Sequence, residues 1–154
     1  MSGKILVINF DKVLFDDNWY LNEKFERFQK NELFPGMYNL LKKYRDLGYR
    51  LVVISNRQHK GPTHKMFEDV LLQSKIAELL EMWIINQAMR SEMLMSIPQE
   101  LHVPEDTPLY LLDFWARDVV PGPTRILHIV NKHEGLQEDD IWEVLKLIRV
   151  SSSN

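Results

Sequence analysis

The sequence predicts an α/β fold in which helices cover a central parallel sheet, and three observations lead to this class. Short runs of consecutive apolar residues recur along the chain, which is the pattern of strands buried on both faces. Longer segments between them repeat apolar residues every three or four positions, as one face of a helix does. Short loops join the two kinds of segment. We therefore expect a doubly wound, three-layer Rossmannoid sandwich with a parallel sheet in the middle.

Five strands are expected, three in the first half of the chain and two in the second. The first of them, KILVIN, is continuously apolar before its last residue, so it should lie in the centre of the sheet. The run LVVIS has the same character and ends in a hydroxyl side chain. The predicted strands cover residues 4–9, 50–56, 82–86, 108–113 and 124–130.

Five helices are expected from the apolar spacing. After the first strand, Leu21, Phe25 and Phe28 stand at i, i+4 and i+7, which predicts a helix. In the next one, Pro35 suits the first turn and Gly48 suits the end. Acidic residues open the last helix, where the helix dipole favours negative charge. The predicted helices cover residues 19–30, 35–48, 63–81, 89–97 and 136–149.

Length and composition bound the organisation of the chain. Its 154 residues, 45% of them hydrophobic, are near the common size of one domain and can fill one core. We therefore expect a single domain over residues 1–154, with loose ends at 1–3 and 151–154. The chain has no cysteine, which excludes disulfide frameworks, thioredoxin-like chemistry and thiolate zinc sites.

The charge and the beginning of the chain limit its partners. A formal net charge of −3 gives no general attraction to nucleic acid or to anionic membranes. The first apolar run meets acids by Asp11 and is too short for a signal sequence or a membrane span. We expect a soluble, cytoplasmic protein without a membrane partner.

Polar residues follow the predicted strands at the edge of the sheet where parallel α/β folds bind their ligands. Asn9 and Asp11 are two positions apart, so an extended backbone points both side chains to the same side. Ser55 and Asn56 end the second strand. The polar residues expected at this edge are Asn9, Asp11, Ser55, Asn56, Arg57, Arg90, Asp113 and Asp118.

These residues resemble the motifs of the haloacid dehalogenase (HAD) superfamily of phosphatases. The family's first motif is an apolar strand that ends in Asp-x-Asp-x-[Thr/Val]-[Leu/Val], and residues 9–14 read Asn-Phe-Asp-Lys-Val-Leu in that register. The second motif, a strand ending in Ser or Thr, matches LVVIS and the helix PG…LL…L…GY before it. The resemblance is good over residues 5–60. The short spacing between the motifs is similar to members without a sizeable cap domain, such as histidinol-phosphate, heptose-bisphosphate and polynucleotide 3′-phosphatases.

The resemblance implies a role for each site residue. Asn9 stands at the position of the nucleophile, and Asp11 at that of the general acid and base. Mg²⁺ would be held by the backbone carbonyl of Asp11 and by Asp113. A phosphoryl group would be bound by Ser55, Asn56 and Arg90. Lys75 is the alternative to Arg90.

Three departures from the family pattern point to an impaired hydrolytic site. Asn9 is neutral, so it is a feeble nucleophile and brings less negative charge to a metal, which weakens the expected Mg²⁺ binding. Lys12 replaces a small residue of the first motif. Phe114 and Trp115 follow Asp113 where the family often has small polar residues or a second acid.

Three functions remain open at this stage. The leading hypothesis is a phosphatase-like protein that binds a phosphorylated ligand or acts as a regulatory module. The alternative is an active Mg²⁺-dependent phosphohydrolase on a nucleotide or polynucleotide end, which requires that Asn9 is an engineered replacement of aspartate or that another group compensates for it. The third is a protein-interaction scaffold, with a homo-oligomer or a protein partner.

Three features of the expected site edge leave alternatives open. Residues 56–65 gather basic side chains that could attract a phosphorylated or nucleic-acid ligand, although a solvated loop has the same composition. Trp115 is either a plug over the pocket or a platform on which a ligand stacks. Asn9 and Asp11 also have the residue types that commonly cap a loop.

Overall fold

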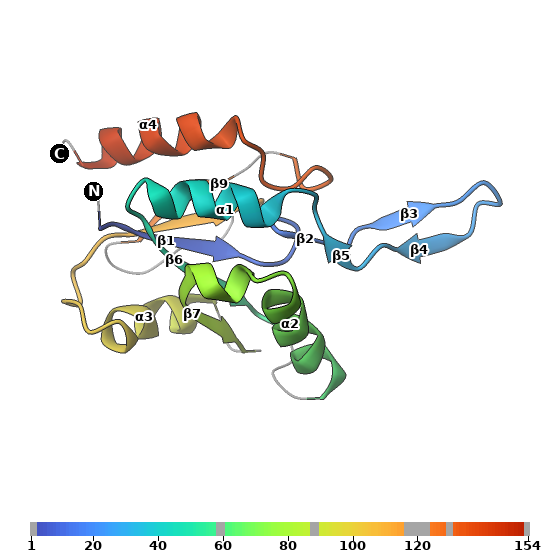
Figure 1. The fold of residues 1–154 in the computed structure, drawn as a ribbon, viewed down its shortest axis with the longest axis horizontal. Helices are drawn as coiled ribbons and strands as arrows, with labels where there is room; N and C mark the ends of the chain where they lie inside the picture. The colour runs from blue at the N-terminus through green and yellow to red at the C-terminus, as the bar shows by residue number, and fades with distance from the viewer. Residues whose placement is uncertain (1–2, 58–60, 87–89, 116–123, 129–130, 153–154) are drawn as a thin grey trace.

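The fold was analysed in a computed structural model that describes residues 3–57, 61–86, 90–115, 124–128 and 131–152. A five-stranded parallel sheet forms its centre, in the order β7-β6-β1-β8-β9 (Figure 1). The α/β class and the central position of the first strand are confirmed. The strands are β1 (Ile5–Asn9), β6 (Arg50–Ser55), β7 (Leu80–Ile85), β8 (Leu109–Asp113) and β9 (Thr124–His128).

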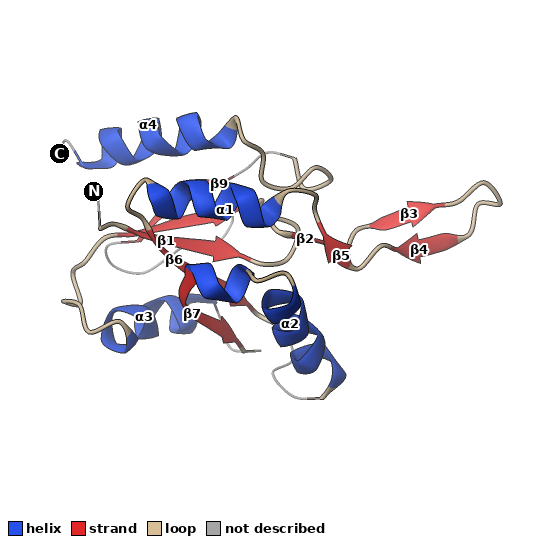
Figure 2. Ribbon diagram, in the orientation of Figure 1, coloured by secondary structure: helices blue, strands red, loops and turns tan. Residues whose placement is uncertain are grey.

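Helices cover both faces of the sheet, which confirms the three layers (Figure 2). Leu6 and Ile8 of β1 face a cluster that contains residues of α1 (Met37–Asp46), α2 (Pro62–Gln73) and α4 (Asp140–Ser152). Ile5 and Val7 face the opposite cluster, which contains residues of α3 (Arg90–Glu100). Since successive side chains of a strand point to opposite faces, the continuously apolar sequence of β1 serves both layers.

The predicted helix over residues 19–30 is wrong, because this segment forms a β-hairpin. Strand β3 (Trp19–Leu21) pairs antiparallel with β4 (Arg27–Gln29). The side chain of Asn22 accepts hydrogen bonds from the backbone N–H groups of Lys24 and Glu26, at 2.8 and 2.9 Å, and thereby closes the turn. Phe25 has a φ of 61°, which a helix does not allow.

The hairpin also explains why apolar residues in this segment have the spacing of a helix face. Tyr20 and Phe28 face each other across the two strands, with ring centroids 5.7 Å apart. The guanidinium of Arg27 lies over the ring of Trp19 at 4.7 Å. These contacts form within the hairpin, and Leu21 and Phe25 stay 62% and 81% exposed. The spacing of Leu21, Phe25 and Phe28 therefore results from cross-strand pairing and a turn, and does not mark a buried helix face.

A short pair of strands joins the hairpin to the body. β2 (Phe15–Asp16) pairs antiparallel with β5 (Glu32–Leu33), and the hairpin extends from this base away from the sheet (Figure 1). Within the described residues, this small insertion is all that separates β1 from α1, and a cap domain of significant size is absent.

The predicted helix over residues 63–81 ends earlier than expected. α2 stops at Gln73, and a short 3₁₀ helix, η1 (Ile76–Leu79), follows. The hydroxyl of Ser74 donates to the carbonyl of Val70 at 2.6 Å, and Lys75 has a φ of 66°. This left-handed residue turns the chain, so β7 begins at Leu80, two residues before the predicted strand.

The described structure reaches close to both ends of the chain. The N–H of Gly3 donates to the carbonyl of Gly48 at 2.9 Å, and α4 continues to Ser152. The loose ends expected at 1–3 and 151–154 stay a prediction. The acids Glu138 and Asp139 precede α4, whose first residue is Asp140.

No helix in the described parts of the chain combines the length and the apolar character that crossing a bilayer requires.

Candidate functional site

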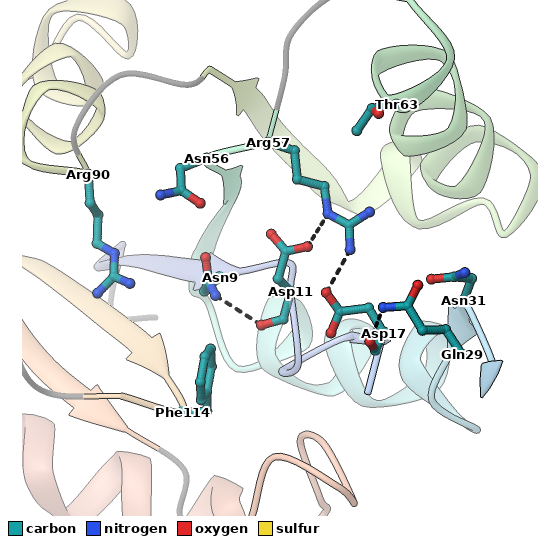
Figure 3. A pocket seen from close by; sticks show the side chains of 10 residues that line it. All are labelled: Asn9, Asp11, Asp17, Gln29, Asn31, Asn56, Arg57, Thr63, Arg90 and Phe114. Atoms are coloured by element: carbon teal, nitrogen blue, oxygen red, sulfur yellow. Dashed lines mark hydrogen bonds and ion pairs between the residues drawn. The ribbon is translucent and has the colours of Figure 1, made fainter. Parts of the chain in front are cut away.

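A cavity of about 600 Å³ opens at the carboxyl edge of the sheet. Its wall combines the ends of β1 and β6, the base of the hairpin, the first turn of α2 and the first residue of α3 (Figure 3). The lining is predominantly polar, with side-chain amides, carboxylates and guanidinium groups. The lining residues are Asn9, Asp11, Asp17, Gln29, Asn31, Asn56, Arg57, Thr63, Arg90 and Phe114.

The register of the sheet brings the predicted residues together. Asn9 pairs with Ile54 of β6, and the N–H of Phe10 donates to the Ile54 carbonyl at 2.8 Å. This places Ser55 beside the loop after β1. On the other side, Ile8 pairs with Leu112, so Asp113 ends β8 next to Asn9. The polar side chains meet because the strands are parallel and end at one edge.

The amide of Asn9 is engaged with the loop that follows it. Its Nδ2 donates to the backbone carbonyl of Asp11 at 2.9 Å (Figure 3). Lys12 has a φ of 66°, and its N–H donates to the carbonyl of Phe15 at 2.8 Å, which makes a tight turn after Asp11. The carbonyl that was expected to bind Mg²⁺ thus accepts a hydrogen bond from the residue at the nucleophile position.

The carboxylate of Asp11 is bound by two neighbours on β6 and the loop after it. Ser55, which is fully buried, donates through Oγ to Asp11 at 2.7 Å. Nε of Arg57 forms an ion pair with the other Asp11 oxygen. The guanidinium also lies over the ring of Phe15, at 5.3 Å from its centroid. Ser55 therefore orients Asp11 and does not line the cavity itself.

Arg57 connects Asp11 to a second carboxylate. Its Nη2 lies 2.8 Å from Asp17 Oδ2 (Figure 3). The ammonium of Lys12 lies 2.6 Å from Asp17 Oδ1. The side chains of Arg57 and Asp17 are 20% and 17% exposed, so these ion pairs are screened less than surface pairs. Arg57 thus bridges two acids and fixes one side of the cavity.

Arg90 and Asp113 form a further ion pair on the opposite side. Asp113 is fully buried, and one of its oxygens accepts the N–H of Phe114 at 2.8 Å. Arg90 Nη1 pairs with the other oxygen. Among the lining residues, it is the guanidinium of Arg90 and not the carboxylate of Asp113 that meets the cavity.

The other predicted residues differ in whether they line the cavity. Asn56 lines the cavity. Lys75 does not, because α2 carries the chain back to the opposite edge of the sheet before η1 begins. Phe114 contributes to the wall, whereas Trp115 does not. A plug over the pocket or a platform for stacking would therefore be formed by Phe114. Asp118 and the basic residues His59 and Lys60 lie outside the described residues.

Several lining residues were not predicted. Gln29 and Asn31 come from β4 and the residue that follows it at the base of the hairpin, and Thr63 comes from α2. The helix predicted over 19–30 concealed Gln29, and Asn31 follows directly after it. Asp17 could have been found, because it belongs to the run of acids after the first strand. Its pairing with Arg57 depends on the tertiary structure.

A buried network beneath Asp17 anchors the hairpin. Asp16 accepts hydrogen bonds from the hydroxyl of Tyr20 at 2.7 Å and from Nδ2 of Asn18 at 2.9 Å. Asn18 also donates to the carbonyl of Lys132 at 2.9 Å. Burial alone raises the pKa of Asp16, but these hydrogen bonds, together with one from the Asn18 N–H, outweigh it and hold the pKa below its usual value of 3.8.

The donor set does not fit the Mg²⁺ site that the motifs imply. Mg²⁺ needs six oxygen ligands in octahedral geometry. The Asp11 carbonyl is bonded to Asn9, the Asp11 carboxylate to Ser55 and Arg57, and Asp113 to Arg90. In the part of the chain that the structure describes, no three His, Cys, Asp or Glu side chains gather in a metal-binding cluster.

Comparison with known proteins identifies the fold. No family model matches the sequence, and no curated protein matches it significantly. An uncharacterized protein from Listeria monocytogenes serotype 4b matches the structure with a TM-score of 0.57 at 10% identity, over 93% of this chain and 99% of that chain. A hypothetical protein from Xanthomonas campestris matches with a TM-score of 0.55 at 12% identity, over 96% and 84%.

A third match carries a functional description. A Vibrio cholerae protein provisionally assigned as 3-deoxy-D-manno-octulosonate 8-phosphate phosphatase has a TM-score of 0.50 and 16% identity, over 96% of this chain and 84% of that one. The chain has the haloacid dehalogenase fold. At these identities the likeness concerns the fold, and the chemistry of this HAD-like chain rests on its own residues.

Proposed function

We propose that this HAD-like protein binds a small phosphorylated ligand without hydrolysing it. One observation carries the proposal: the residue at the nucleophile position is Asn9, and its amide donates to the Asp11 carbonyl. An amide lacks the negative charge that a carboxylate brings to attack on phosphorus. Hydrolysis is therefore lost at its first step, the attack on phosphorus, whereas the ligand cavity is retained.

The cavity has groups suited to a phosphoryl ligand. A guanidinium carries five N–H donors and suits the geometry of phosphate oxygens. Arg57 uses Nε and one terminal nitrogen for Asp11 and Asp17, and its third nitrogen points to the side of Thr63 (Figure 3). Amides of Asn9 and Asn56 and the hydroxyl of Thr63 provide neutral donors. Gln29 and Asn31 line the cavity at the hairpin and suit a polar, hydroxyl-bearing remainder of the ligand.

Binding and turnover should be measured on the same preparation. We expect inorganic phosphate to bind in isothermal titration calorimetry, and no release of phosphate from p-nitrophenyl phosphate or nucleotides with Mg²⁺. Asn9→Asp restores the carboxylate, and Asn56→Asp is the matched control, because it adds the same charge to the same cavity away from β1. We expect both variants to stay inactive, since Arg57 and Arg90 still hold Asp11 and Asp113.

The result that would overturn the proposal is Mg²⁺-dependent turnover by the unaltered chain that disappears in Asp11→Ala. This would favour the phosphohydrolase on nucleotides or polynucleotide ends. Activity that appears only in Asn9→Asp, and not in Asn56→Asp, would leave the proposal intact and show that one functional group separates binding from catalysis.

A protein-interaction role is the second candidate, and the hairpin favours it. Trp19, Leu21 and Phe25 are more than half exposed on an element that projects from the body. The hairpin is therefore the surface that we assign to the scaffold hypothesis. Sedimentation velocity of the unaltered chain and of Leu21→Ser/Phe25→Ser tests self-association: a concentration-dependent shift that the double variant removes would support it, and monomers in both would exclude it.

A further inference from the structure

We infer that the cavity takes its phosphorylated ligand without a divalent cation, because Arg57, Arg90 and Lys12 hold the carboxylates that such an ion would need. The ligand part of this inference rests on the proposed function, and the metal part stands independently of it. Asp11 is the first residue to consider, because the HAD motifs offer its backbone carbonyl to Mg²⁺ and its carboxylate lies beside that position.

All three oxygens of Asp11 accept a donor from within the protein. The carbonyl accepts from Asn9 at 2.9 Å, and one carboxylate oxygen accepts from Ser55 at 2.7 Å. The other oxygen is paired with Arg57. An oxygen that accepts one donor keeps a second lone pair, but a metal ion that shared these oxygens would lie close to the positive charge of Arg57, and one that displaced the donors would leave them unpaired among partly buried groups.

The second carboxylate on this side is equally committed. One oxygen of Asp17 pairs with Lys12 at 2.6 Å, and the other pairs with Arg57 at 2.8 Å. The same guanidinium therefore spans Asp11 and Asp17. A cation placed between these two acids would meet the positive charge of Arg57 at close range.

Asp113 is withdrawn from the cavity in the same manner. It is fully buried at the end of β8, and the ion pair with Arg90 occupies the oxygen that the Phe114 N–H does not. Because Arg90 lines the cavity and Asp113 does not, an approaching ion meets a guanidinium first. Both sides of the expected metal position thus present arginine in place of a free carboxylate.

The charges of this site are balanced without an ion. Asp11, Asp17 and Asp113 contribute three negative charges, and Lys12, Arg57 and Arg90 contribute three positive charges. A divalent cation would leave an excess of positive charge among part-buried groups, which is unfavourable. A phosphate dianion would change this balance in the opposite sense, but its oxygens would accept hydrogen bonds from the guanidinium and amide N–H groups at the wall, which a cation cannot do.

Metal affinity is the first test, with Mn²⁺ as the probe and electron paramagnetic resonance of the free ion as the readout. We expect no binding to the unaltered chain at about millimolar Mn²⁺, near the weak limit of protein sites for such ions. Arg57→Gln removes the ion-pair partner of one oxygen each of Asp11 and Asp17, and we expect it to raise Mn²⁺ affinity by about tenfold or more. Adding Asp11→Asn to Arg57→Gln should remove this gain.

The matched control is Arg149→Gln, which removes the same charge from the exposed side of α4, and we expect it to leave Mn²⁺ binding unchanged. The inference is overturned if the unaltered chain binds Mn²⁺ below millimolar concentration and Asp11→Asn abolishes that binding. It is also overturned if Arg57→Gln, shown to be folded by circular dichroism, gains no affinity.

Phosphate affinity is the second test, and it separates this inference from the proposed function. We expect inorganic phosphate to bind with the same affinity in EDTA and in Mg²⁺, within about twofold, and Arg57→Gln to weaken binding by about tenfold or more. Phosphate binding that requires Mg²⁺ overturns the inference. If phosphate fails to bind under both conditions, the proposed function and the ligand part fail, whereas the Mn²⁺ result still decides the metal part.

Discussion

The parallel sheet and the β3–β4 hairpin are built from neighbouring segments but are stabilised in different ways. β1 is buried along its whole length, and its side chains contact helices on both faces of the sheet. Ten residues later, the hairpin leaves Trp19, Leu21 and Phe25 exposed and is held by its own turn, ring contacts and the Asp16 network. An apolar residue in the first region contributes to global stability, whereas one in the second contributes mainly to local structure.

Residues of both regions form the cavity. The sheet brings Asn9, Asp11 and Ser55 to one edge through the pairing of β1 with β6. The hairpin base adds Gln29 and Asn31. We expect the end of the cavity at the sheet to be as stable as the core, and the end at the hairpin to open more readily.

The largest expected effect is the loss of a buried ring at the end of β1. Phe10 is fully buried, and its ring lies 4.9 Å from those of Phe15 and Phe67. Phe10→Ala should lower the free energy of unfolding by about 3–5 kcal/mol, because it removes apolar contacts and leaves a cavity. Urea denaturation followed by circular dichroism measures this, and a loss under about 1 kcal/mol would show that the site loop is not part of the core.

A smaller effect is expected where the hairpin joins the body. Asp16→Asn removes a buried charge that accepts three hydrogen bonds, and should cost about 1–3 kcal/mol at pH 6. Exposed Asp46→Asn on α1 is the matched control, and should change stability by less than about 0.5 kcal/mol.

The pH dependence of the Asp16 variant has a defined sign. The pKa of Asp16 is held below 3.8 in the folded protein, so its stabilising contribution is complete above that pH. As the pH falls below 3.8, the unfolded chain takes up the proton first and the contribution is lost. The stability difference between the unaltered chain and Asp16→Asn should therefore shrink between pH 6 and pH 2.5. A constant difference would contradict this account.

The turn of the hairpin should affect only its own region. Asn22→Ala removes the acceptor for the Lys24 and Glu26 N–H groups, and we expect a local loss of about 0.5–1 kcal/mol. Amide hydrogen exchange should accelerate at Lys24 and Glu26 and remain unchanged in β1. Asn39→Ala, also exposed but on α1, serves as the control. Acceleration throughout the sheet would mean that the hairpin and the core unfold as one unit.

The smallest effect is expected at the tip of the hairpin. Phe25 is 81% exposed, so Phe25→Ala should change the free energy of unfolding by less than about 0.5 kcal/mol. Phe10→Ala and Phe25→Ala, measured in one series of urea titrations, thus compare the two regions directly. A large loss at Phe25 would show that a partner copy covers the hairpin in solution.

Sequence reasoning succeeded where burial is two-sided and failed where structure is local. The continuous apolar runs of β1, β6 and β8 have the length of strands, and the residues predicted at their edge include Asn9, Asp11, Asn56 and Arg90, which line one cavity. Residues 19–30 failed because a short hairpin and a helix can show the same spacing of three apolar residues. The decisive signal was Asn22, whose side chain closes the turn.

The sequence by itself determined the layered α/β fold and the neutral Asn9 at the end of the first strand, because strand burial and the order of residues along a strand are properties of contiguous residues. Only the tertiary structure decided that Arg57 bridges Asp11 and Asp17 and that Arg90 covers Asp113. These partners are separated by 46, 40 and 23 positions, and meet only through the parallel pairing of β1 with β6 and β8 and the return of the chain through α3. Ion pairs of this kind depend on distance in space, which no local pattern of residues records.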